Sequence, residues 1–269
     1  MSLLVFSHAN SYPASTYAVL FAQLKKRGFK VRAVDKFGHD PAYPVTDNWP
    51  NLVAQLHQLL ARESEKAGEP AHLVGHSLGG FLSLMTAAQY PQLARSVLLI
   101  DAPILSGWRA QTLGVIKATQ FIKRVSPSAV SHKRTHKWAS HEAALAHFSG
   151  KKVFARWDPQ VLADYVQAFT QNDDGTVTLS FDRKVESAIY NTLPDHLGAL
   201  LKRHPLKCPA AFIGGMQSKE MARVGLAMTQ EVTGGRMSYL DGGHLFPMEQ
   251  PVATAAAIEA NLRNMERLG

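Results

Sequence analysis

The sequence predicts an α/β protein with a mostly parallel sheet of about six strands, flanked by helices. Three observations lead to this fold class. Strand-like and helix-like segments alternate along most of the chain. The strand-like segments are short continuous apolar runs, which is typical of parallel strands covered on both faces. Between residues 104 and 200 the alternation gives way to helix-forming stretches punctuated by prolines. We therefore expect a core formed by residues 1–103 and 201–269, with a mostly helical insertion at 104–200.

The expected strands are short apolar runs. The second of them carries Lys30 and Arg32, which favours a place at the edge of the sheet, where cations discourage pairing with another chain. Inside the insertion, Thr176–Phe181 is strand-like and follows the turn signal Asp173-Asp174-Gly175. In chain order, the core strands are expected at Leu3–Phe6, Lys30–Val34, Ala71–Val74, Val97–Ile100, Pro209–Ile213 and Met237–Leu240.

The expected helices follow these strands. An amphipathic stretch from Ser15 to Arg27 stops at Gly28, a residue suited to end a helix. The next helix has apolar residues at helical spacing, and the third is built from small residues and ends near Pro91. The four core helices are expected at Ser15–Arg27, Trp49–Lys66, Leu78–Gln89 and Pro251–Arg267.

Composition limits the classes of protein that fit. The chain has 269 residues, 46% of them hydrophobic, but no run of about 18 or more apolar residues, so we expect no membrane span. The N-terminus lacks a basic segment before its short apolar run, so we expect no signal peptide. Cys208 is the only cysteine, which excludes an internal disulfide and fits a reducing compartment. We therefore expect a cytoplasmic protein.

The net charge is +8, and basic residues gather between Lys117 and Lys137. We interpret this cluster as a solvated face. The alternative is a site for an anionic substrate, a phospholipid surface or nucleic acid, but no nucleic-acid motif accompanies it, so we expect no nucleic-acid partner. If the cluster reads substrate charge, neutralising Lys133, Arg134 and Lys137 should raise KM for anionic esters alone.

The stretch GHSLGG, residues 75–80, lies between an expected strand and an expected helix. A sharp strand-to-helix turn can hold the side chain of Ser77 above the sheet edge, and it requires small neighbours, here Gly75 and Gly79. Leu78 would then be the first residue of the helix, and its N–H would point toward a developing oxyanion. The pattern predicts that Ser77 is a nucleophile; the alternative is a packing serine in a tight turn.

With this motif in its structural context, the sequence resembles the α/β-hydrolase family over nearly its whole length. The resemblance implies that Ser77 is the nucleophile. Ser7-His8-Ala9-Asn10, after the first strand, resembles the family's His-Gly loop. By position, the backbone N–H of Asn10 is the second oxyanion donor, although Ala9 replaces the usual glycine. We expect His8 to support the loop rather than to act in catalysis.

A second motif, Asp241-Gly242-Gly243-His244, follows the last expected strand and resembles the loop that carries the family's catalytic histidine. A histidine can act as a general base near neutral pH if it reaches the serine hydroxyl. We therefore predict that His244 is the base.

The position of the acid departs from the family pattern. Most members carry an aspartate after the penultimate strand, where this chain has Ser218. Two carboxylates are available. Asp101 follows the strand beside the nucleophile strand, a position that some family members use, and Glu220 lies two residues beyond the usual position. We favour Asp101 and keep Glu220 as the alternative.

These motifs predict a serine hydrolase that cleaves a carboxylic ester or a related acyl bond, without metal or organic cofactor. A thioesterase and a carbon–carbon bond hydrolase fit the same machinery. A non-catalytic ligand-binding relative is the alternative from another class. The insertion is expected to act as a lid whose aromatic residues contribute to an apolar acyl pocket, although each of them could instead pack within the lid: Trp108, Phe121, Trp138, Phe148, Phe154 and Trp157. The sequence leaves the oligomeric state open.

Overall fold

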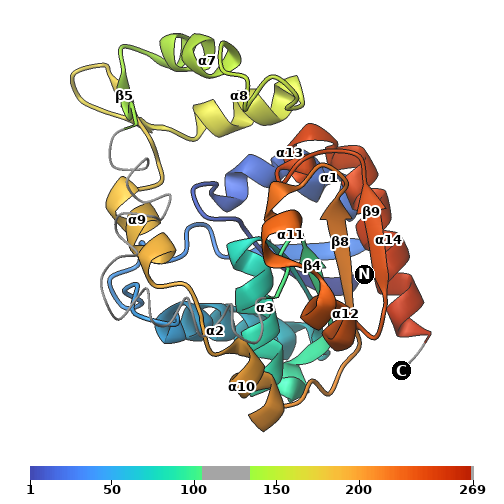
Figure 1. The fold of residues 1–269 in the computed structure, drawn as a ribbon. Coiled ribbons are helices and arrows are strands. Elements are labelled where there is room, and N and C mark those ends of the chain that lie inside the picture. Colours follow the sequence, from blue (N-terminus) through green and yellow to red (C-terminus); the bar gives the residue numbers. More distant parts are fainter. Residues whose placement is uncertain (105–133, 268–269) are drawn as a thin grey trace.

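A computed structural model describes residues 1–104 and 134–267 (Figure 1). Their main feature is a six-stranded sheet in the order β2-β1-β3-β4-β8-β9, in which every neighbouring pair is parallel. The predicted strands are all present and the fold class is confirmed. The strands are β1 (Ser2–Ser7), β2 (Phe29–Ala33), β3 (Ala71–His76), β4 (Ala94–Ile100), β8 (Ala210–Gly215) and β9 (Met237–Leu240).

Helices cover both faces of this sheet, which explains the continuous apolar runs. Successive side chains of a strand point to opposite faces. In β1, Leu4 and Phe6 belong to the core cluster under α1 (Ala18–Lys26) and α14 (Pro251–Glu266). Leu3 and Val5 belong to the cluster under α2 (Pro50–Ala67) and α3 (Leu78–Gln89) on the other face (Figure 1).

The edges of the sheet agree with the charge pattern. β2 is an edge strand, as predicted from its lysine and arginine. Arg32 leaves the strand to meet the buried carboxylate of Glu63 on α2, with Nε 2.9 Å from Oε2. In the described part of the chain, no helix combines the length and the apolar character needed to cross a bilayer.

Residues 134–200, within the segment expected to be an insertion, combine short helices with turns and short strands. They contain α7 (His141–Ser149), α8 (Pro159–Gln167) and α9 (Arg183–Asn191), and α10 (Leu197–Arg203) leads back to the core. A small antiparallel sheet joins β5 (Lys137–Trp138), β7 (Val177–Thr178) and β6 (Thr170–Gln171). The strand-like piece expected at 176–181 thus forms only a two-residue strand.

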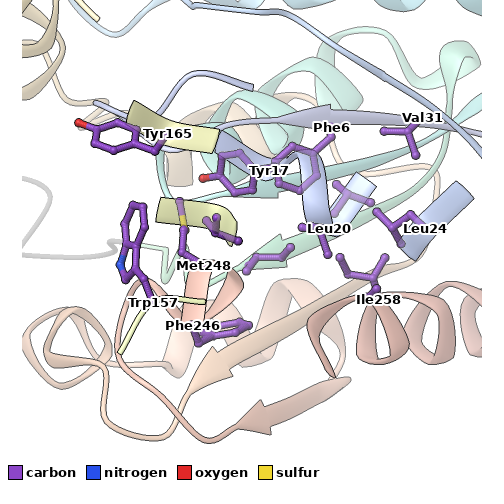
Figure 2. Close-up of a cluster of buried hydrophobic side chains, with 14 of the residues drawn as sticks. Phe6, Tyr17, Leu20, Leu24, Val31, Trp157, Tyr165, Phe246, Met248 and Ile258 are labelled. Carbon is purple, nitrogen blue, oxygen red and sulfur yellow. The ribbon is translucent and has the colours of Figure 1, made fainter. Parts of the chain in front are cut away.

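The aromatic residues of the insertion pack mainly against one another. Phe148 lies 5.3 Å from Trp138 and 4.9 Å from Phe154 between ring centroids, and Phe154 lies 4.8 Å from Trp157. Trp157 and Tyr165 also join the core cluster of α1 and α14 (Figure 2). Trp108 and Phe121, like Lys133 and most of the basic cluster, lie outside the described residues.

Candidate active site

Ser77 lies at the turn between β3 and α3, with φ 54° and ψ −116°. A non-glycine residue with positive φ is strained, as the sharp strand-to-helix turn demands. The turn also needs its glycines. A Cβ at Gly75 would lie 2.0 Å from the carbonyl oxygen of Gly79, and a Cβ at Gly79 would lie 2.0 Å from that of Ser7. The GHSLGG motif thus forms the predicted turn for a steric reason.

His244 reaches Ser77 from the loop between β9 and α13 (Phe246–Glu249). The distance between His244 Nε2 and Ser77 Oγ is 3.0 Å. Gly242 has φ 128°, and a Cβ at Gly215 would lie 2.4 Å from the carbonyl oxygen of Gly243. The loop therefore passes close over the end of β8, and glycines at these positions let it do so.

Asp101 lies directly after β4, and its side chain is fully buried. His244 Nδ1 is 2.6 Å from Asp101 Oδ2. Two further donors hold the carboxylate: the Ser218 hydroxyl donates to Oδ2 at 2.6 Å, and the N–H of Gly215 donates to Oδ1 at 3.0 Å. Glu220 Oε2 is 4.0 Å from His244 Nδ1. Of the two predicted carboxylates, Asp101 therefore makes the hydrogen bond and Glu220 does not.

Ser218, at the position where most of the family carry the acid, contacts the same carboxylate. Its hydroxyl also accepts a hydrogen bond from the N–H of Met221 at 3.4 Å, at the start of α11 (Lys219–Val224). The serine at the usual acid position is thus hydrogen-bonded to the Asp101 carboxylate.

The loop after β1 contributes Asn10, which lines the same cavity as Ser77. Its side-chain Nδ2 donates to the carbonyl oxygen of Glu186 at 3.1 Å, so the amide is engaged with α9. The backbone N–H of Asn10 remains the group expected to face an oxyanion. Leu78 is the first residue of α3, where an N–H has no acceptor within the helix.

His8 has a structural environment, as expected. It is buried, its Nδ1 is 2.8 Å from the carbonyl oxygen of Ala9, and its Nε2 accepts from the N–H of Phe37 at 3.0 Å. Burial lowers the pKa of His8 to about 4, so the ring is neutral at neutral pH. Ala9, which stands where the family usually has glycine, is buried, and the loop that contains it lines the cavity.

The cavity has a volume of about 600 Å³, and its described wall is rich in charged residues. Arg134 Nη2 is 2.9 Å from the buried carboxylate of Glu186, and the Ser11 hydroxyl donates to the other oxygen of Glu186 at 2.5 Å. The lining residues are Ala9, Asn10, Ser11, Tyr12, Ser77, Arg134, Lys152, Val153, Arg156, Glu186, Tyr190, Gln217, Lys219, Glu220, Gly243, His244, Leu245 and Glu249.

Residues between 134 and 200 provide part of this wall, including some that the sequence did not single out. Arg156 contacts both flanks of the His244 loop: Nε is 3.2 Å from Glu249 and Nη2 is 3.3 Å from Asp241. The phenol of Tyr190 is buried beside Glu186, and both effects raise its pKa to about 12. Arg156 lies in the turns between α7 and α8 and Tyr190 lies on α9, and neither segment carries a motif, so no local signal could have found them.

One group of side chains could in principle bind a metal ion among residues 1–104 and 134–267. It consists of Asp101, Glu220 and His244, with potential ligand atoms within 4.8 Å of one another. Asp101 and His244 already hydrogen-bond to each other at 2.6 Å, and an ion would have to break that bond. The expectation of no metal or organic cofactor stays a prediction.

The model of the alpha/beta hydrolase family matches residues 4–257. Among curated proteins, a serine hydrolase-like protein of Dictyostelium discoideum is 24% identical over 256 residues, which cover 89% of this chain and 69% of that protein. A 2-(acetamidomethylene)succinate hydrolase of Mesorhizobium japonicum is 36% identical over 105 residues, which cover 37% of this chain and 35% of the enzyme.

Solved structures share the fold. The crystal structure of E-2-(acetamidomethylene)succinate hydrolase has a TM-score of 0.74 at 22% identity and covers 97% of this chain and 91% of its own. The thioesterase domain from the curacin biosynthetic pathway has a TM-score of 0.72 at 19% identity, with 96% and 90% covered. At these identities the likeness concerns the fold alone, whereas the family model spans nearly the whole chain. The chain therefore belongs to the alpha/beta hydrolase family.

Proposed function

We propose that this chain is a serine hydrolase that cleaves a carboxylic ester or a related acyl bond through an acyl-enzyme. The observation that carries the proposal is the pair of hydrogen bonds that His244 makes, 3.0 Å to Ser77 and 2.6 Å to Asp101. A nucleophile, a base and a group that orients the base are the minimum for this chemistry.

In the proposed first step, Ser77 Oγ attacks the carbonyl carbon of the substrate and its proton passes to His244 Nε2. The carboxylate of Asp101 accepts a hydrogen bond from Nδ1–H, which keeps the neutral ring in the tautomer that can receive this proton. The same carboxylate stabilises the imidazolium that forms. The N–H groups of Leu78 and Asn10 would stabilise the negative charge on the carbonyl oxygen.

In the second half of the step, the tetrahedral intermediate collapses and His244 gives its proton to the leaving alcohol. A water molecule then attacks the acyl-enzyme with His244 again as base. His244 then passes the proton that it took from water to Ser77 Oγ as the acid product leaves. The reaction needs no proton donor beyond these residues.

The same residues could also act in a thioesterase or in a carbon–carbon bond hydrolase, the two alternatives that the sequence suggested. A thioester, or a carbon–carbon bond next to a carbonyl, presents a carbonyl to Ser77 in the same way. The structural relatives include a thioesterase domain. The case for a non-catalytic ligand-binding protein rested on Ser218 at the usual acid position, and it weakens because Asp101 supplies a carboxylate to His244.

For the substrate, we propose a small ester that carries an anionic group. Trp138, Phe148, Phe154 and Trp157, which we expected to contribute to an apolar acyl pocket, are not among the residues that line the cavity. Among the described lining residues are instead four cations, Arg134, Lys152, Arg156 and Lys219, against three carboxylates, Glu186, Glu220 and Glu249. Arg134 and Arg156 pair with Glu186 and Glu249, which leaves Lys152 and Lys219 for an anionic substrate. That the substrate has an apolar acyl group stays a prediction, and these aromatic residues do not support it. The name of one curated relative specifies a succinate derivative, which is dianionic at neutral pH.

We further propose that the insertion at 104–200 serves as a lid. Its support is that Lys152, Arg156, Glu186 and Tyr190 all come from this segment and line the cavity that contains Ser77. A lid excludes water from the reacting groups and so strengthens the electrostatic interactions among them.

A fluorophosphonate probe tests the proposal for a serine nucleophile. The purified chain should be labelled at Ser77, and Ser77→Ala should abolish labelling. Ser83→Ala is the matched control, because Ser83 is a buried serine on α3 that does not line the cavity. Equal labelling of wild type and Ser77→Ala, or no labelling of the wild type, would contradict the proposal.

A further inference from the structure

A buried chain of hydrogen bonds joins the two loops that flank Ser77. The N–H of Ala9, in the loop after β1, donates to the Tyr17 hydroxyl oxygen at 3.1 Å. Tyr17 Oη is 2.7 Å from His76 Nδ1, and His76 Nε2 is 2.8 Å from the carbonyl oxygen of His244. The chain thus runs from the neighbour of Asn10 to the backbone of His244. It passes through His76, the residue directly before Ser77.

The chemistry of the groups fixes the direction of every bond. The carbonyl of His244 can only accept, so His76 Nε2 must carry a hydrogen and donate it. In the neutral ring Nδ1 is then an acceptor, and the Tyr17 hydroxyl must donate to it. The hydroxyl oxygen of Tyr17 in turn accepts from Ala9. No second arrangement of hydrogens satisfies all three contacts while His76 is neutral.

Burial protects this arrangement. Tyr17 is 1% exposed and His76 is 0% exposed. Tyr17 lies among the apolar side chains of the core, next to Phe6 (Figure 2). Burial and the nearby His244 ring lower the pKa of His76 to about 3, and burial raises the pKa of Tyr17. Both groups therefore stay neutral at the pH values where a histidine base works.

We propose that Tyr17 and His76 are positioning residues that hold the Asn10 loop and the His244 backbone in register with Ser77. The inference rests on the proposed function, because it assigns these loops to the oxyanion and the base. His76 precedes Ser77 directly in the chain, so its two hydrogen bonds hold both loops at fixed positions relative to the nucleophile. Neither Tyr17 nor His76 is among the residues that line the cavity.

The expected effect follows from the geometry. A shift of about 1 Å in a catalytic group can cost roughly 10²-fold in rate. Removing one link leaves the backbone of Ala9 or His244 with one anchor fewer, while no side chain that lines the cavity is replaced. kcat should therefore fall and KM should stay nearly constant.

Four variants separate positioning from packing. Tyr17→Phe removes only the hydroxyl. His76→Gln can keep a donor near the place of Nε2, whereas the shorter His76→Asn loses the contact with the His244 carbonyl. His72→Asn is the control, because His72 is also a fully buried histidine on β3 but bonds to Ser96 and Glu266 instead. Circular dichroism at the assay temperature checks that each variant is folded.

With a short-chain p-nitrophenyl ester, Tyr17→Phe and His76→Asn should lower kcat roughly 10- to 100-fold, with KM within about threefold of the wild type. His76→Gln should retain more of kcat than His76→Asn, and His72→Asn should keep nearly all of it. If Tyr17→Phe and His76→Asn lower kcat no more than the control does, or if they raise KM and leave kcat unchanged, the proposal is wrong.

A second measurement does not depend on turnover. The proton in the short hydrogen bond between His244 Nδ1 and Asp101 should give a low-field NMR resonance, as expected of a charge-assisted bond of 2.6 Å. That resonance should shift or broaden in Tyr17→Phe and His76→Asn but not in His72→Asn. An unchanged resonance would overturn the inference. A wild type without hydrolysis or fluorophosphonate labelling would overturn the proposed function, and the resonance would still test the positioning.

Discussion

Replacing Asp101 with asparagine changes one atom in the proposed triad and should nearly abolish turnover. In the structure, Asp101 Oδ1 accepts from the N–H of Gly215, and Oδ2 faces both His244 Nδ1 and the Ser218 hydroxyl. If the asparagine keeps its oxygen toward Gly215, its NH₂ group faces His244. The ring must then accept at Nδ1 and carry its hydrogen on Nε2. In that tautomer it cannot take the proton of Ser77.

The magnitude follows from this tautomer. The loss for the analogous change in other Ser-His-Asp enzymes is about 10⁴-fold in kcat, which corresponds to about 5.5 kcal/mol of transition-state stabilisation. We expect a similar loss, because the carboxylate is fully buried and water cannot replace it. Glu220→Gln should lower kcat less than tenfold, since Glu220 Oε2 is 4.0 Å from Nδ1.

Steady-state kinetics with a p-nitrophenyl ester measures both variants, and thermal unfolding shows whether each one is folded. A folded Asp101→Asn that keeps most of its kcat would refute the reasoning. A larger loss in Glu220→Gln than in Asp101→Asn would assign the acid to Glu220 instead.

An exchange of positions sharpens the test. Ser218 Oγ lies 2.6 Å from the same Asp101 oxygen that contacts His244. The double variant Asp101→Ser with Ser218→Asp should therefore have a kcat at least tenfold higher than that of Asp101→Ser alone, because the new carboxylate would lie within reach of the His244 ring. Aspartate also suits the start of α11, where Ser218 now caps the helix. No recovery in a folded double variant would show that the backbone at residue 218 cannot present an acid to His244.

Ser77→Ala should lower kcat by about 10⁴- to 10⁶-fold with folding intact, because it removes the hydroxyl that lies 3.0 Å from His244 Nε2. Ester hydrolysis close to the wild-type rate would contradict the mechanism. The double variant Lys152→Gln with Lys219→Gln should raise KM for mono-p-nitrophenyl glutarate about three- to tenfold and leave p-nitrophenyl butyrate unchanged. Lys137→Gln is its control: the sequence grouped Lys137 with residues that could read substrate charge, but it pairs with Asp174 at 2.9 Å and is not among the described lining residues. Equal effects on both esters would argue against charge recognition. Burial lowers the pKa of His8 to about 4 and that of His76 to about 3, so below the ordinary value of 6.5 the unfolded chain binds more protons than the folded one. These two rings should therefore contribute a fall of about 3 to 4 kcal/mol in the free energy of unfolding, measured with urea, from pH 7 to pH 5. A flat profile would contradict the burial of these rings as neutral groups.

Much of the core could be predicted from local sequence, because its elements are specified by nearest neighbours. A strand covered on both faces needs a continuous apolar run, and β1, β3, β4 and β8 each have one. The turn at Ser77 needs glycine at 75 and 79, because a Cβ at either position would meet backbone within 2.0 Å. The positions of Ser77 and His244 in their loops follow from such short-range constraints.

The acid could not be fixed in the same way. Asp101 and Glu220 both follow strands whose ends lie at one edge of the sheet, and sequence spacing favours neither one decisively. The parallel register of β4 and β8 pairs Ile100 with Ile213. This pairing brings Asp101 next to Gly215 and Ser218, where three donors converge on its carboxylate.

The wall of the cavity and the hydrogen-bond chain behind it were decided by tertiary structure alone. Glu186 meets Ser11 across 175 positions of sequence, and His76 meets the carbonyl of His244 across 168. No periodicity or motif links residues so far apart, because each contact depends on how α9 or a loop crosses the end of the sheet. The sequence by itself determined the sheet, the strained turn at Ser77 and the histidine loop, since these depend on local sterics. The choice of Asp101, the charged wall and the link through Tyr17 depend on long-range packing, which only the folded chain contains.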